Sequence, residues 1–162
     1  MRVGGKNVPG LCEAALTAIT EAVVITEAVL TRPGPTIVYV NPAFEAMTGY
    51  AADEVIGRTP RMLQGRATDR DVLDRLREGL EQHGYFHGEA INYRKDGTPY
   101  VVEWVISAIR GEDDDVTHWV AAQRDITVHR ASADHQRALY ADVVQQIRST
   151  TSKLRDLVER AR

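Results

Sequence analysis

The sequence predicts an α+β fold in which an antiparallel sheet carries short helices on one face. Two β-rich stretches, 23–26 and 36–40, come before a run of short helical stretches, and three further β-rich stretches follow it. Separate runs of strands and helices are typical of an antiparallel sheet with its helices gathered on one side. The Asp96-Gly97 pair between two of the later stretches is a strong hairpin signal and supports antiparallel pairing.

Bulk composition predicts one soluble domain with flanking elements. The chain has 162 residues, 43% of them hydrophobic and 27% charged, which is ordinary for a globular protein. Its formal charge of -3 gives no general attraction for nucleic acid or anionic membranes. The longest apolar runs have about four residues, against roughly 20 for a membrane span. Cys12 is the only cysteine, so an internal disulfide is excluded and a cytoplasmic location is expected.

The first third of the chain predicts a helix, a β-hairpin and two more short helices. Apolar residues at helical spacing predict a helix from Pro9 to about Glu21. The two early β-rich stretches are joined by a Pro/Gly-rich segment, which predicts an antiparallel hairpin. Asn41 is suited to cap a helix that begins at Pro42 and runs through Met47. Another brief helix is expected over 51–56.

The middle of the chain predicts a turn, a longer helix and the rest of the sheet. Residues 57–65 are expected to form a proline-interrupted turn that presents Arg61 and Gln64. Apolar residues at three- and four-residue spacing predict a helix over 69–81. The remaining strands are expected at 88–94, 99–109 and 117–125, with the acidic run 112–115 as a solvated hairpin tip.

The last segment predicts a helix with an apolar seam. From about Ala131, apolar side chains step by three and four residues in a heptad pattern that spans fewer than three heptads. We expect this seam to pair with the same helix of a second chain, and the alternative is that it folds back onto the sheet. The seam consists of Tyr140, Val143, Ile147, Thr150, Leu154 and Leu157.

Four segments resemble the PAS (Per-Arnt-Sim) domain family. They are 38–50, 57–64, 92–97 and 123–127, and they occur in the family's order. The resemblance covers roughly 20–128. It implies a five-stranded antiparallel sheet that cups a ligand against short helices, with flanking helices that dimerise and transmit signals. The resulting division is a cap helix in 1–21, a sensor domain in 22–128 and a signalling helix in 129–162.

Within that family the sequence is most similar to the light-oxygen-voltage branch, which binds a flavin. The resemblance implies that Arg61 and Arg77 pair with the flavin phosphate, a task suited to planar guanidinium groups. It also implies that Gln64 lies near the ribityl chain, that Asn92 reads the polar edge of the ring, and that Gln123 senses the central ring and relays its state to the sheet. The implied cofactor is FMN or FAD.

Four further positions are expected to line the pocket, and they depart from the branch pattern. Pro60 stands where the adduct-forming cysteine would be, and Thr59 replaces a neighbouring asparagine. Proline has no thiol, so a covalent photoadduct is impossible at that position. Val102 replaces a second ring-reading asparagine, and Trp104 lies on the same strand face because side chains alternate. The flavin would then serve a light or redox sensor that forms no adduct.

Other readings of the same residues remain open. The arginines and amides could be inherited scaffold, with Trp104 filling the pocket of a ligand-free interaction module. Haem is less favoured, because none of the five histidines has metal-ligand spacing with another histidine or cysteine. No nucleophile triad, P-loop or dinucleotide glycine pattern is present, so we expect no enzyme. The expected partner is a second copy of the chain, with the output domain or protein unknown.

Overall fold

The computed structural model describes residues 14–138, 141, 142 and 145. The chain divides into two compact units, Met1–Ile126 and Thr127–Arg162, which are described separately. In the part that the structure describes, no helix has the length and apolar character needed to span a membrane.

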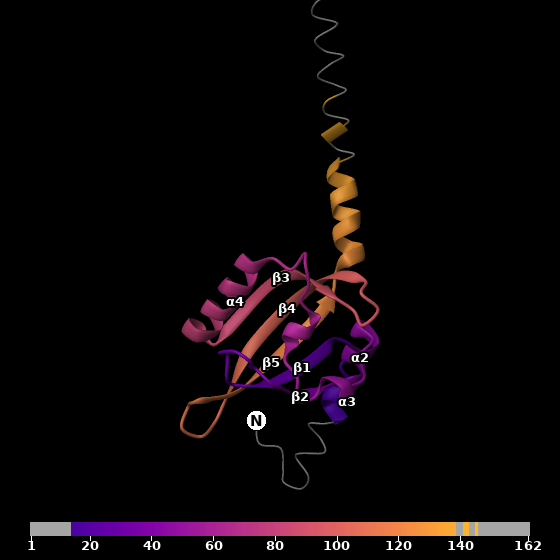
Figure 1. The fold of residues 1–162 in the computed structure, drawn as a ribbon. Helices are drawn as coiled ribbons and strands as arrows, with labels where there is room; N and C mark the ends of the chain where they lie inside the picture. Colours follow the sequence, from indigo (N-terminus) through magenta and orange to yellow (C-terminus); the bar gives the residue numbers. More distant parts are fainter. Residues whose placement is uncertain (1–13, 139–140, 143–144, 146–162) are drawn as a thin grey trace, which may run out of the picture. The chain divides into compact units, whose positions relative to one another are not determined.

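The first unit is built on a five-stranded antiparallel sheet (Figure 1). The spatial order of the strands is β2-β1-β5-β4-β3, so the two hairpins of the sequence join through β5 in the centre. This confirms the predicted α+β fold and its antiparallel sheet. The strands are β1 (Ala22–Glu27), β2 (Ile37–Val40), β3 (Tyr85–Tyr93), β4 (Pro99–Arg110) and β5 (Val116–Asp125).

The segment between β2 and β3 supplies the helices, which lie on one face of the sheet (Figure 1). The helix α4 packs on β3 and β4, whereas α2 packs on β1 and α3 on β2. The helical elements are α2 (Pro42–Thr48), α3 (Ala52–Val55), the 3-10 helix η1 (Pro60–Leu63) and α4 (Arg70–His83).

Several predicted boundaries are corrected. The expected turn over 57–65 contains the 3-10 helix η1, because Pro60 begins that helix and does not interrupt it. The strand β3 begins at Tyr85, directly after Gly84 ends α4 in a left-handed conformation. Of the expected first helix, the structure describes a helical stretch over 14–18, and the expected part before residue 14 lies outside the described residues.

Asn41 joins the start of the chain to the sheet. Its side-chain oxygen accepts hydrogen bonds from the Val23 amide at 2.8 Å and the Phe44 amide at 3.1 Å, the latter as the predicted cap of α2. Its side-chain nitrogen donates to the carbonyls of Leu16, Ile19 and Glu21. One buried side chain therefore fixes three segments together.

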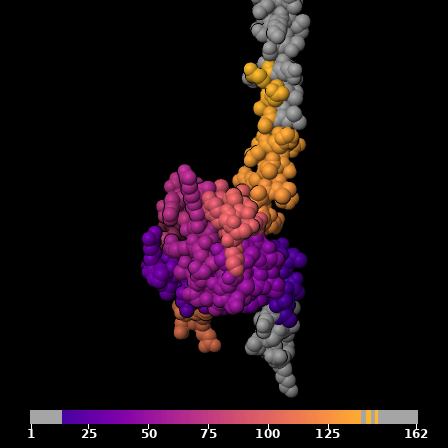
Figure 2. All heavy atoms as spheres, turned by 45° about the vertical axis from the view of Figure 1, so that its right-hand side comes forward, coloured from indigo at the N-terminus to yellow at the C-terminus, as the bar shows by residue number. Residues whose placement is uncertain are grey.

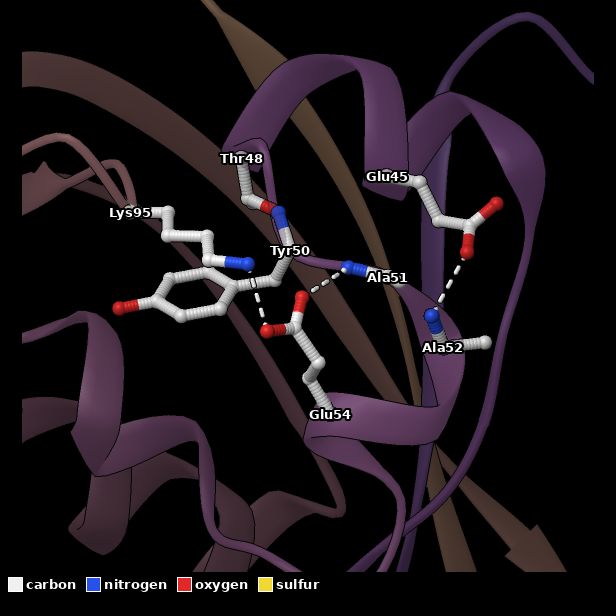
Figure 3. A network of polar contacts seen from close by, with 7 residues as sticks. All are labelled: Glu45, Thr48, Tyr50, Ala51, Ala52, Glu54 and Lys95. Carbon is white, nitrogen blue, oxygen red and sulfur yellow. Dashed lines mark hydrogen bonds and ion pairs between the residues drawn. The ribbon is translucent and has the colours of Figure 1, made fainter.

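A polar network closes the connection between α2 and α3 (Figure 3). The Glu54 carboxylate accepts from the Ala51 amide at 2.9 Å and pairs with the Lys95 ammonium at 2.5 Å. The Glu45 carboxylate accepts from the Ala52 amide at 2.6 Å. The Lys95 ammonium beside it holds the pKa of Glu54 below its usual value. This exposed network connects the short helices to the β3–β4 turn.

That turn depends on a glycine. Gly97 has φ +84°, and its amide donates to the Arg94 carbonyl at 2.9 Å. The Thr98 amide donates to the Asp96 carboxylate at 2.8 Å, which lowers the pKa of Asp96. The other predicted turn, around 111–115, projects from the domain as the solvated tip between β4 and β5 (Figures 1 and 2).

The core consists of two apolar clusters on the helix-covered face of the sheet. One contains Val72, Leu80, Trp104 and Trp119, and the other contains residues of β1, β2, α2, α3 and η1, with Phe44 fully buried in it. Partly buried side chains such as Ala121 contact both clusters. The clusters do not meet everywhere, and the space between them is the site described below.

The second unit is helical where it is described, over residues 127–138. The six residues of the predicted apolar seam all lie outside the described residues: Tyr140, Val143, Ile147, Thr150, Leu154 and Leu157. The predicted pairing of this helix therefore stays a prediction.

Candidate functional site

A cavity of about 250 Å³ lies between the two core clusters and is called the inner cavity here. Its walls come from β1, the 31–35 loop, η1, α4 and the three long strands. Apolar side chains form most of the surface, among them Leu73, Leu76 and Leu80 of α4 and Ile106 of β4. All five predicted cofactor-binding residues line it: Arg61, Gln64, Arg77, Asn92 and Gln123.

The two amides at the sheet end of the inner cavity are buried and incompletely bonded. Asn92 is 3% exposed and Gln123 is 6% exposed. The side-chain oxygens Asn92 Oδ1 and Gln123 Oε1 have no hydrogen-bond partner in the described structure. An unpaired buried polar atom costs roughly 1–3 kcal/mol of stability, so a pair of them facing one cavity indicates a polar ligand.

The 3-10 helix η1 places Arg61 and Gln64 at the mouth of the inner cavity. Thr59 precedes this single turn of helix, and Gln64 follows it, with the Gln64 amide donating to the Arg61 carbonyl at 3.0 Å. Arg61 is half-buried, and its Nε atom is buried with no partner in the described structure. The Arg61 guanidinium therefore has donor capacity left for an anion.

Arg77 lies on α4 at the same mouth but is more exposed. Its Nε donates to the Glu81 carboxylate at 2.9 Å, one helical turn further on. Both side chains are about half exposed, and such surface pairs contribute little to stability. The pair can therefore open at small cost if an anion occupies the mouth.

Of the four expected pocket-lining residues, two line the inner cavity and two do not. Pro60 and Trp104 line the inner cavity. Thr59 does not line it, because Thr59 precedes η1 and faces a second hollow outside the mouth. Val102 is fully buried in the core cluster and is not among the cavity residues, since its short side chain is packed there together with Tyr100 and Trp104.

Two tryptophans line the inner cavity. Trp104 of β4 pairs with Gln123 on the neighbouring strand β5, and the centroid of its ring is 6.5 Å from that of the Phe86 ring. Trp119 is held by a 3.1 Å hydrogen bond from its Nε1 to the Ala28 carbonyl. Trp119 was missed as a site residue, although it lies four positions before Gln123 and strand alternation puts both on one face.

Further arginines at the mouth were also missed. Arg32, from the 31–35 loop, and Arg70, at the start of α4, both line the inner cavity. Both also line a more open adjoining hollow, called the outer hollow here. It is lined by Arg32, Pro33, Thr59, Arg61, Gln64, Gly65, Arg66, Thr68 and Arg70. Arginines from separate loops and helices share no sequence spacing, so the fold was needed to bring them together.

A buried tyrosine lies beside Asn92 outside the cavity lining. Tyr100 is 1% exposed and faces Asn92 across the β3–β4 pair. Burial raises the pKa of Tyr100 to about 12, although the neighbouring Asn92 amide and Arg94 guanidinium work in the opposite direction. The Arg94 guanidinium lies 4.6 Å from the centre of the Tyr100 ring. This tyrosine is therefore neutral at ordinary pH.

The inner cavity also borders the end of β5. Gln123 lines both the inner cavity and a groove that includes Glu21, Arg94 and Asp125. The Arg94 guanidinium pairs with the Asp125 carboxylate and donates to the Met47 carbonyl. Gln123 is therefore two residues from Asp125, whose contact with Arg94 joins β5 to the residue that follows β3 and, through Met47, to α2.

Histidines take no part in the inner cavity as the described residues form it. His87 lies on the other face of the sheet, where its Nε2 is 3.1 Å from the Glu103 carboxylate. The described residues contain no group of three side chains arranged to hold a metal ion. The haem reading gains no support from this geometry.

Comparison with known proteins agrees with the fold and the motifs. The sequence profile of the PAS domain family matches residues 22–128. Blue-light-activated histidine kinase 1 of Erythrobacter litoralis is 39% identical over 115 residues, which are 69% of this chain and 32% of that protein. Phototropin-1A of Oryza sativa subsp. japonica is 36% identical over 114 residues, 70% of this chain and 12% of that protein.

The solved structures include a light-oxygen-voltage domain studied with a flavin analogue. It is 32% identical and superposes with a TM-score of 0.67, covering 82% of this chain and 96% of that domain. The chain spans a third or less of the two curated relatives, so the similarity concerns one domain of those larger proteins. The chain belongs to the PAS domain family and to its light-oxygen-voltage branch.

Proposed function

We propose that the inner cavity binds a flavin, FMN or FAD, and that the chain is the sensory domain of a light or redox receptor. The observation that carries this proposal is the pair of unbonded buried oxygens, Asn92 Oδ1 and Gln123 Oε1, at one end of a cavity with arginines at the other. An apolar cavity with a few convergent polar groups is a typical ligand site.

The chemistry of the lining fits a flavin. The isoalloxazine ring is flat and apolar on its faces, and its polar edge both donates and accepts hydrogen bonds. Amide side chains can do the same, because each carries an acceptor oxygen and a donor nitrogen. Leucines of α4 and the two tryptophans supply apolar walls. Arg61 and Arg77 at the mouth suit a phosphate-bearing tail.

Pro60 sets the type of chemistry. It lines the inner cavity at the position that matches the adduct-forming cysteine of the branch, and it carries no thiol. The one cysteine, Cys12, lies outside the described residues. The chain's residues at the cavity would therefore hold and orient the flavin, while the flavin itself supplies absorbance and redox capacity. One relative is named as a blue-light-activated histidine kinase and another as a phototropin, which favours light as the stimulus.

Transmission would run through β5. Gln123 faces the inner cavity and also borders the groove with Arg94 and Asp125, after which β5 ends. A ligand that prefers one arrangement of this region would shift the populations of the two arrangements. We further propose that the helix after β5 pairs with a second copy through the seam of Tyr140, Val143, Ile147, Thr150, Leu154 and Leu157, together with the N-terminal helix.

A ligand-free interaction module is the second candidate. The inner cavity, at about 250 Å³, is slightly smaller than the roughly 300–1,000 Å³ typical of ligand pockets. Trp104 accounts for part of that reduction, since its large side chain forms one wall. On this reading the unpaired amides are a cost of the inherited scaffold. The two candidates differ in whether those amides contact anything.

Titration of ligand-free protein with riboflavin, followed by quenching of flavin fluorescence, separates them. Riboflavin has no phosphate, so its affinity reports on the inner cavity alone. We expect Asn92→Leu and Gln123→Leu each to weaken binding by roughly 5- to 100-fold, the loss of one buried hydrogen bond. The matched control is Gln82→Leu on the exposed face of α4, which should leave affinity unchanged.

Absence of riboflavin binding to folded protein would eliminate the flavin proposal and leave the interaction module. Binding that the two inner variants do not weaken would place the flavin somewhere other than the inner cavity. Either result contradicts the proposal.

A further inference from the structure

The inner cavity and the outer hollow lie next to each other. They share Arg32, Arg61, Gln64 and Arg70 in their walls. The outer hollow measures about 860 Å³ and opens to solvent. A ligand whose ring occupies the inner cavity would therefore extend its tail between these shared residues into the outer hollow.

The lining of the outer hollow contains arginines and no acidic residue. Four of its nine lining residues are arginines, and none is aspartate or glutamate. They come from separate segments: Arg32 from the loop after β1, Arg61 from η1, Arg66 from the connection between η1 and α4, and Arg70 from the first residue of α4. In the described residues none of these four guanidinium groups makes an ion pair, whereas Arg77, Arg94 and Arg110 each do.

This gathering of charge exceeds what one phosphate group requires. A guanidinium binds phosphate oxygens through two parallel hydrogen bonds, so Arg61 and Arg77 are enough for a monophosphate. Arg32, Arg66 and Arg70 then remain as three positive charges that make no ion pair in the described structure. Like charges held together repel one another, and a second anionic group would relieve this repulsion.

We propose that the outer hollow binds the second phosphate group of a flavin dinucleotide, so that the chain prefers the dinucleotide to the mononucleotide. This inference rests on the proposed flavin function. Arg32, Arg66 and Arg70 are the residues that distinguish the two cofactors, and Arg61 lies between the two phosphates. The open shape of the hollow leaves room for the nucleoside beyond them.

Titrations of ligand-free protein with riboflavin, FMN and FAD at fixed salt test this directly. We expect FAD to bind at least tenfold more tightly than FMN. In the variant Arg66→Gln, which changes a residue that lines the outer hollow and not the inner cavity, FAD should lose much of that advantage while riboflavin affinity stays unchanged. The matched control is Arg75→Gln, an exposed arginine of α4 that lines neither hollow.

The outcomes distinguish this inference from the function on which it rests. If riboflavin and FMN bind but FAD binds no more tightly, the second-phosphate site is wrong and the flavin function stands. The second-phosphate site is equally wrong if Arg66→Gln, with a thermal midpoint equal to that of the control, leaves the FAD advantage intact. If none of the three flavins binds, both proposals fail.

A competition experiment distinguishes binding of the flavin tail in the outer hollow from binding of an unrelated anion. Inorganic pyrophosphate should compete with FAD for the outer hollow and leave riboflavin affinity unchanged. Pyrophosphate that binds without displacing FAD would show an independent anion site and would overturn the inference.

Discussion

Among single residues, the buried amides fall into two kinds. Asn41 is 1% exposed and has five hydrogen bonds, so its polar atoms are satisfied. Asn92 and Gln123 are comparably buried, yet one oxygen of each is unbonded in the described structure. Satisfied buried amides stabilise a fold, whereas unsatisfied ones cost stability. This contrast separates a structural amide from two candidate ligand-binding amides.

Replacement of Asn41 should be among the more damaging single changes. Asn41→Ala removes the α2 cap, leaves the buried Val23 amide without this partner and breaks the bonds to the carbonyls of 16–21. We expect a loss of roughly 2–4 kcal/mol in the free energy of unfolding, measured by urea denaturation. Asn41→Ser keeps a capping oxygen and should lose less. Equal losses in the two variants would mean that the cap adds little stability and that the link to 16–21 accounts for the loss.

Replacement of Asn92 should have the opposite effect on the ligand-free protein. Leucine has nearly the shape of asparagine and leaves no unpaired oxygen, so Asn92→Leu should hold or raise the free energy of unfolding, by about 1 kcal/mol at most. The same variant should bind flavin poorly. A large loss of stability would show that the Asn92 amide is bonded within the protein and serves the fold.

Tyr100 predicts how stability changes in alkaline solution. Its folded pKa of about 12 lies above the value near 10 expected for the unfolded chain. The folded state therefore keeps the proton longer, and stability is complete below pH about 10 and falls between pH about 10 and 12. The loss should be on the order of 2 kcal/mol. Urea denaturation at several pH values measures it.

The control for this prediction is Tyr100→Phe. Phenylalanine keeps the ring beside Arg94 and removes the buried hydroxyl, which lies beside the Asn92 amide. The variant should show no alkaline loss assigned to this position and no loss at neutral pH. An unchanged alkaline profile in the variant would contradict the assignment.

At the scale of elements, the sequence predicted what periodicity and turn chemistry control. The Asn41-Pro42 start of α2, the apolar face of α4 and the Asp96-Gly97 hairpin all depend on local signals, and all three are confirmed. The 3-10 form of η1 was not predicted, because Pro60 is equally compatible with a turn and with the first position of a helix.

Site residues could be predicted from the sequence only where they belong to a family motif or to one face of a strand. Arg61, Gln64, Arg77, Asn92 and Gln123 were named from the family resemblance, and all line one cavity. Trp119 was accessible through strand alternation with Gln123. Arg32 and Arg70 could not be found from the sequence. Arg32 lies on a loop and Arg70 begins a helix, and only tertiary packing brings them to the same mouth. Val102 was misplaced for the same reason, since neighbouring large side chains decide what reaches the cavity.

The β3–β4 turn offers a test at this scale. A Cβ at position 97 would have no atom within 4 Å, so Gly97→Ala costs only the strain of a left-handed backbone, roughly 1–2 kcal/mol. Gly97→Asn should cost less, because asparagine tolerates that conformation. Thermal denaturation of the two variants checks the order. An alanine variant with an unchanged thermal midpoint would mean that the turn can change its conformation.

At the scale of the whole molecule, the two compact units predict separable roles. A chain that ends at Val128 keeps the entire sheet and every residue of the inner cavity and loses the predicted seam. We expect the shortened chain to sediment as a monomer and the full chain as a dimer, with equal riboflavin affinity. A full chain that stays monomeric at high concentration would refute the proposed pairing.

The central claim is that the inner cavity holds a flavin beside a proline that cannot form a thiol adduct. The most direct measurement is the absorbance spectrum of the full chain after refolding with flavin and removal of excess ligand, before and after blue light, beside a Pro60→Cys variant. We expect both proteins to retain a blue absorbance band. That band should bleach reversibly, as a thiol adduct requires, only in the cysteine variant. Two folded but colourless proteins would contradict the account.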